Sequence, residues 1–109
     1  MRDYPGEFEQ MVLLAVLRLG ADAYAVPVRA EIEACTDRKV ARGALYTALE
    51  RLDAKGLVRS KAGDPLPERG GRARRYFTVT PRGLAALRAA NTAMDSLRQG
   101  VESLLEKPR

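Results

Sequence analysis

The residues of this chain whose side chains are most suited to binding a ligand are its arginines and lysines, which are concentrated in the middle of the sequence. Residues 38–82 contain 12 basic and 4 acidic residues, a net charge of +8, whereas the whole chain of 109 residues carries +5. Cationic side chains at this density attract polyanions, because each neutralised phosphate releases a counterion. A solvated basic surface without a ligand is the alternative interpretation. The charge pattern thus indicates a surface that meets nucleic acid.

Side chains for catalysis and metal binding are scarce. The chain has no histidine and a single cysteine, Cys35, so the usual Cys/His zinc spacings and the commonest catalytic acid/base are missing. No nucleophile has a base beside it, and we therefore expect neither an enzyme nor a cofactor or metal. Cys35 lies three residues after Ile32 and is predicted to be a small core residue, with a redox switch as the alternative.

The length of the chain fits one domain, or one domain with a single long appendage. A chain of this size, 46% hydrophobic, buries a limited share of its surface alone, so we expect oligomerisation. The longest apolar run, Met11 to Leu17, has 7 residues, far fewer than the roughly 20 that cross a bilayer. A cytoplasmic protein without a membrane partner is expected.

Three short helices are expected before the pattern changes at Gly56. Apolar residues at helical spacing predict the first helix over Glu7–Leu19. Pro27, a residue favoured at the first helical position, is expected to start the second, which ends near Thr36. The third is expected over about Ala41–Lys55, with Gly56 as a left-handed residue after it. Its buried side is predicted to consist of Leu45, Ala48, Leu49 and Leu52.

A β-hairpin is expected after Gly56. The segments Leu57–Lys61 and Arg74–Thr80 are rich in β-branched and aromatic residues, which favours strands. Between them, Ala62–Ala73 contains several glycines and prolines and is predicted to be a loop that cannot continue a strand.

A long final helix is expected over residues 81–107, with Thr80 as its N-cap and Pro81 at its first position. It would reach about 40 Å if continuous, although Gly100 is a weak point within it. Two sets of residues repeat every seven positions and form an apolar stripe, which either folds back on the core or, as the length favours, pairs with a second subunit. The stripe consists of Leu87, Ala90, Met94, Leu97, Val101 and Leu104.

The order of three helices, a hairpin and a final helix is typical of a winged helix-turn-helix, a mostly α fold with one β-hairpin. We expect residues 1–80 to form the DNA-binding domain and residues 81–109 the C-terminal dimerisation helix. Particular motifs extend the comparison: GALYTALERL at 43–52, KGLV at 55–58 and GGRARRYFTVTPRG at 70–83.

On these motifs the chain resembles the PadR family of bacterial transcriptional regulators over about residues 7–90, and its single terminal helix resembles the compact subfamily. The resemblance implies a homodimeric repressor whose affinity for DNA falls when a ligand binds between the subunits. Two positions depart from the family pattern, since Ala41 stands where Ser is common and Thr47 where Pro is common. Compact members stack flat ligands on tryptophan, which this chain lacks.

The outer face of the third helix is expected to approach double-stranded DNA. Gly43 permits close backbone approach, Thr47 meets a thymine methyl or a phosphate, and Glu50 reads cytosine or pairs with a neighbouring arginine. Tyr46 is expected to bond phosphate, and a half-buried ring over the helix junction is the alternative. Arg42, near the helix start, is expected to contact a phosphate or a guanine, and Arg51 lies on the flank of this face.

The hairpin tip is expected to bring Arg72, Arg74 and Arg75 together beside two glycines. Such a tip fits a narrow minor groove or straddles phosphates, whereas arginines that only keep an edge strand soluble are the alternative.

A small apolar or aromatic effector is expected between two subunits. Phe8, Met11, Met94 and Leu97 would line its site, because methionine adapts to ligands of different shape. The alternative function is that of a winged-helix adaptor that binds proteins without reading a DNA sequence.

Overall fold

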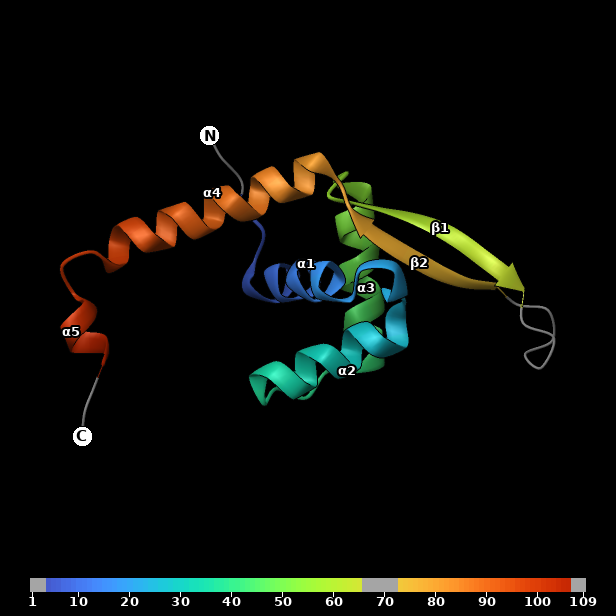
Figure 1. The fold of residues 1–109 in the computed structure, drawn as a ribbon, viewed down its shortest axis with the longest axis horizontal. Helices are drawn as coiled ribbons and strands as arrows, with labels where there is room; N and C mark the ends of the chain where they lie inside the picture. Colours follow the sequence, from blue (N-terminus) through green and yellow to red (C-terminus); the bar gives the residue numbers. More distant parts are fainter. Residues whose placement is uncertain (1–3, 66–72, 107–109) are drawn as a thin grey trace.

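The computed structural model describes residues 4–65 and 73–106. Figure 1 shows three helices packed together, a hairpin that projects to one side and a long helix that leaves on the other. This confirms the predicted fold class. The elements, in chain order, are α1 (Glu7–Leu19), η1 (Gly20–Asp22), α2 (Ala25–Thr36), α3 (Arg42–Ala54), β1 (Val58–Pro65), β2 (Ala73–Val79), α4 (Pro81–Arg98) and α5 (Glu102–Leu105).

One hydrophobic core joins α1, α2 and α3 to the base of the hairpin and the start of α4. The predicted buried side of α3 is confirmed, because its four apolar residues are at most 5% exposed. Phe77 and Val79 of β2 and Leu87 of α4 pack into the same core. Burial of these side chains fixes the orientation of α3, so its opposite face points outward.

α2 begins at Ala25, two residues before the predicted start at Pro27. Pro27 therefore occupies the third helical position. Its missing N–H costs nothing there, since the first four amides of a helix have no partner within the helix. The backbone of Tyr24, just before α2, forms an antiparallel bridge with Tyr76 of β2, and the amide of Phe77 donates to the carbonyl of Ala23 at 2.8 Å. This edge pairing explains the earlier start.

β1 continues past Lys61 to Pro65, so the prediction that residues 62–65 belong to the loop was wrong. The register shifts between Ala62 and Pro65, and Pro65 then pairs with Ala73. A proline is tolerated at such an irregular strand end because no ladder amide is required of it. Gly63 lies against Tyr76, and a Cβ atom on Gly63 would stand 2.7 Å from the ring carbon Cε1.

The junction between hairpin and α4 is tightly bonded. Thr80 caps α4 as predicted, since its Oγ1 accepts from the amide of Gly83 at 3.0 Å and donates to the carbonyl of Gly56 at 2.7 Å. The amide of Thr80 donates to the carbonyl of Leu57 at 3.0 Å. Gly56 has φ +77, the left-handed conformation predicted after α3. These bonds fix the direction in which α4 leaves the core.

The final helix is not continuous to residue 107, contrary to prediction. α4 ends at Arg98, Gly100 adopts φ +89, and the four-residue helix α5 follows. Glycine favours such a break because it reaches the left-handed region without steric cost and is a poor helix former. α4 alone spans about 27 Å at 1.5 Å per residue. No helix within the described ranges combines the length and apolar character of a membrane-spanning segment.

Cys35 is exposed, so its predicted place in the core was wrong. Val28 and Ile32 supply the buried face of α2, and Cys35 at the last turn lies beyond the reach of the core. Its thiol donates to Oε2 of Glu31 at 3.5 Å, and the same oxygen accepts from Nε of Arg18 at 2.6 Å. These two bonds, that from Arg18 first, lower the pKa of the Glu31 carboxyl.

Candidate nucleic-acid interface

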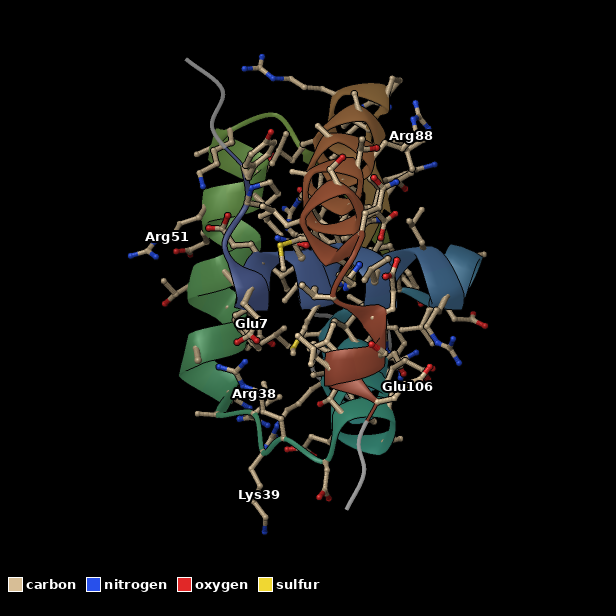
Figure 2. All side chains as sticks on the ribbon, turned by 90° about the vertical axis from the view of Figure 1, so that its left-hand side faces the viewer. Glu7, Arg38, Lys39, Arg51, Arg88 and Glu106 are labelled. Atoms are coloured by element: carbon tan, nitrogen blue, oxygen red, sulfur yellow. The ribbon has the colours of Figure 1, made fainter. Side chains whose placement is uncertain are left out.

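The outer face of α3 carries six of the residues predicted to contact DNA. All six of its candidates are exposed, and Tyr46 retains 47% of its accessible surface. Figure 2 shows α3 along one side of the molecule, with Arg51 directed away from the body. The six residues are Arg42, Gly43, Tyr46, Thr47, Glu50 and Arg51.

A groove runs along α3 on the side of α1. It has a volume of about 490 Å³, and Gly43, Thr47 and Arg51 line it together with Phe8 and Glu9 of α1. Glycine at residue 43 leaves the floor open, since a Cβ atom there would meet nothing within 4 Å. Three of the predicted contact residues thus share one depression with the start of α1, which the sequence did not indicate.

A second and larger groove separates α3 from the hairpin. It has a volume of about 680 Å³ and is lined by Tyr46 and Glu50 of α3 and by Arg74 and Arg75 of β2. The hairpin arginines therefore lie across a groove from the helix rather than apart from it. Nη1 of Arg75 donates to Oγ of Ser60 on β1 at 2.9 Å, which holds this guanidinium near the groove.

Tyr24 is a residue of this groove that sequence reasoning missed. Its ring packs edge-on against Tyr76 with centroids 5.4 Å apart, and the guanidinium of Arg74 lies 4.4 Å from the centre of the Tyr24 ring. Cation–π contact of this kind orients an arginine side chain. No local signal identifies Tyr24, because the residues that it contacts lie about 50 positions later in the chain.

Two cations of the basic segment 38–82 are paired with carboxylates of α1. Nη1 of Arg38 lies 3.3 Å from Oε1 of Glu7, and Nζ of Lys55 lies 2.9 Å from Oε1 of Glu9. Figure 2 shows Glu7 and Arg38 side by side near the start of α3. The two ion pairs flank α3 at its opposite ends, so part of the positive charge counted from the sequence is offset within the protomer.

The residues predicted to bind an effector occupy two separate elements. Phe8 and Met11 lie on α1 against the core, where the guanidinium of Arg38 covers them, 4.9 Å from the Phe8 ring centre and 3.7 Å from Sδ of Met11. Met94 and Leu97 lie on α4 and are 50% and 75% exposed. Arg72 lies outside the described residues.

The predicted dimerisation stripe divides into two parts. Leu87 and Ala90 are 3% and 2% exposed within the protomer, so the first part packs on its own core rather than on a partner. The second part is exposed and crosses the break at Gly100, which interrupts the heptad spacing. It consists of Met94, Leu97, Val101 and Leu104.

The model of the transcriptional regulator PadR-like family matches residues 13–89, more than half of the chain. The chain belongs to this family. It is therefore a DNA-binding transcriptional regulator with a winged-helix fold, and its family is one of regulators rather than enzymes. We found no match among curated protein sequences.

Several solved structures are similar to this chain in fold. A PadR family transcriptional regulator from Eggerthella lenta is 27% identical, with a TM-score of 0.67 over 94% of this chain and 88% of that one. A PadR family regulator from Clostridium difficile is 17% identical, with a TM-score of 0.70 over 91% and 99%. The winged-helix DNA-binding protein F93 from STIV is 15% identical, with a TM-score of 0.68 over 90% and 98%.

Proposed function

We propose that this PadR-like protein is a homodimeric repressor that binds an inverted-repeat operator. Residues 1–80 form the unit that reads DNA and residues 81–109 the unit that pairs the subunits. The observation that carries the proposal is the exposed outer face of α3, which lies beside a hairpin bearing Arg74 and Arg75 across one groove. In winged-helix proteins a helix of this kind enters the major groove of DNA, while the hairpin contacts the DNA backbone or the minor groove.

Particular side chains that border the two grooves beside α3 support a contact with DNA. Tyr46, Arg74 and Arg75 border the hairpin-side groove, and phenol and guanidinium groups are common phosphate ligands. Gly43 and Thr47 border the α1-side groove without bulky side chains, which suits close approach to base edges. Sequence specificity would come from α3 and general affinity from the hairpin.

Exposed apolar residues at the end of the chain support a dimer. Leu97, Leu104 and Leu105 are 75%, 79% and 66% exposed, and exposure of large apolar side chains to water is unfavourable. A second copy of the same segment would bury them. Because a two-fold axis relates the two subunits, the operator would repeat with the same symmetry.

Binding to duplex DNA is expected to depend steeply on salt. If six to ten phosphates are neutralised, the logarithm of the association constant falls with the logarithm of salt concentration at a slope of about −5 to −9. Fluorescence anisotropy on fragments selected from a pool of genomic DNA measures this slope. Binding that does not respond to salt, or no binding to any fragment in the pool, contradicts the proposal.

Two kinds of substitution separate the recognition of a base sequence from general affinity for DNA. Arg74→Ala combined with Arg75→Ala is expected to weaken operator and non-specific DNA about equally, because both residues contact backbone. Thr47→Ala is expected to change the preferred sequence at one position of each half-site, with a discrimination loss of about 1 kcal/mol. Arg88→Ala is the control, since Arg88 lies on the side of the molecule away from Arg51 (Figure 2).

An adaptor role would give the opposite pattern. If the chain acts through protein contacts alone, neutralising arginines of the basic segment leaves its partner binding intact and no fragment is enriched from the pool. The same experiments thus decide between the two classes of function.

Release by a small ligand is a further part of the proposal. A small apolar or aromatic effector between the subunits, near Phe8, Met11, Met94 and Leu97, lowers DNA affinity only if it prefers one dimer geometry. A hundredfold loss of operator affinity requires about 2.7 kcal/mol of such preference. With no tryptophan in the chain, planar ligands are expected to bind more weakly than to relatives that stack them.

Titration calorimetry with phenolic acids and planar dyes, in the presence and absence of operator, tests this release. Ligands that bind but leave operator affinity unchanged show that the site has no regulatory role. If none of the ligands binds, release by an effector of this chemical class is rejected.

A further inference from the structure

The N-terminus of α3 lacks the usual local stabilisation. Its N-cap, Ala41, offers no side-chain hydrogen bond, whereas a Ser, Thr or Asp there contributes about 1 kcal/mol. The next residue, Arg42, places a cation at the positive end of the helix dipole. Gly43 follows, and glycine has a low helix propensity. Local sequence alone would therefore allow the first turn of α3 to fray.

Two side chains of α2 hold the residue that precedes this N-cap. Nε of Arg29 donates to the carbonyl oxygen of Val40 at 2.7 Å, and the amide of Val40 donates to Oε2 of Glu33 at 2.8 Å. Both bonds are partly buried. Arg29 and Glu33 are four residues apart, one turn of α2, so they reach Val40 from the same face. Both polar backbone groups of Val40 are thereby bonded to charged side chains.

The rest of the segment between α2 and α3 is fixed from the same helix. Oγ1 of Thr36 donates to the carbonyl of Ile32 at 2.7 Å and accepts from the amide of Arg38 at 3.2 Å. The side chain of Val40 is 3% exposed and anchors the segment to the core. Figure 2 shows this connecting segment, with Arg38 and Lys39 labelled, at the N-terminal end of α3. The carbonyl of Ala41 then accepts the first helical bond from Leu45 at 3.1 Å.

We propose that Arg29 and Glu33 are positioning residues for DNA recognition, which replace the missing N-cap by fixing Val40 and thereby the first turn of α3. This inference rests on the proposed reading of DNA by α3. Arg42 and Gly43 lie in that first turn and Tyr46 immediately follows it, so fraying would displace several candidate contacts together. Precise placement matters more for base contacts than for backbone contacts, because hydrogen bonds to base edges are directional.

The test compares two neutral replacements of one residue. Glu33→Ala removes both the charge and the acceptor for the Val40 amide, whereas Glu33→Gln removes the charge and keeps an acceptor oxygen. In Glu33→Ala we expect amide hydrogen exchange in residues 40–46 to rise about tenfold, with little change in α1 and α4. Glu33→Gln is expected to restore most of the protection. Equal exchange in the two variants and wild type would overturn the proposal.

The same variants are then measured on operator and on random duplex DNA. We expect Glu33→Ala to lose about tenfold in operator affinity relative to Glu33→Gln, and the two to bind random DNA equally, because their net charges match. Glu31→Ala is the control on α2, since its carboxylate pairs with Arg18 instead. Equal operator affinity in the two Glu33 variants would overturn the role in recognition. If wild type itself prefers no sequence, the proposed function fails, while the exchange result still decides whether α3 is held in place.

Discussion

Leu97→Asp is expected to abolish both dimerisation and operator binding. Leu97 is 75% exposed in the protomer, so the substitution leaves the fold of the protomer intact. In a dimer formed through the exposed part of the stripe, the new carboxylate would be buried without a partner, at a cost of several kcal/mol. The dissociation constant of the dimer is therefore expected to rise more than a hundredfold. Operator affinity falls with it, because a single subunit contacts one half-site only.

Sedimentation equilibrium and anisotropy measure these two effects on the same preparation. Thr92→Asp introduces the same charge on the same helix, but Thr92 is exposed and lies about 140° around the helix from Leu97 at 100° per residue. It is expected to sediment and bind as wild type. If Leu97→Asp remains a dimer of unchanged stability, the subunits associate through another surface, and the pairing role proposed for residues 81–109 is wrong.

Gly83→Ala is expected to destabilise the protein by about 3 kcal/mol. A Cβ atom on Gly83 would lie 2.1 Å from the carbonyl oxygen of Leu57 and 2.8 Å from Cγ1 of Val79. The backbone of Leu57 cannot move away freely, since its carbonyl accepts the bond from Thr80 that joins hairpin to α4. Relief of the clash thus breaks that bond or shifts α4. For a chain of this size, the midpoint of thermal unfolding would fall by roughly 10–20 °C.

Gly43→Ala is the matched control, because it adds the same methyl group within the first turn of another helix. A Cβ atom on Gly43 meets nothing within 4 Å, so stability is expected to stay constant or rise by up to about 1 kcal/mol. Its operator affinity is nevertheless expected to fall, since the methyl group would face DNA. Thermal unfolding of both variants measures this difference. A Gly83→Ala protein as stable as wild type would show that the junction between the hairpin and α4 accommodates the methyl group without loss of stability.

Elements whose signals are local were predictable from the sequence. Helix α1 has the predicted bounds, Glu7–Leu19, because its apolar spacing and flanking glycines lie within a few residues of each other. The cap formed by Thr80 and Pro81 and the left-handed Gly56 were predictable for the same reason. The winged-helix order follows from these elements, and the motifs at 43–58 and 70–83 indicated the PadR family.

Features that depend on residues far apart in the chain became visible only in the folded protein. The earlier start of α2 comes from the pairing of Tyr24 with Tyr76. The two hydrogen bonds between α2 side chains and the backbone of Val40 form only when the segment after α2 folds back along that helix. Periodicity placed Cys35 on the apolar face, but the core ends before it. The same periodicity joined Leu87 and Leu97 in one stripe, whereas the first is buried in the protomer and the second is exposed. Spacing along a helix predicts which residues share a face. The extent of the neighbouring elements determines how much of that face is covered.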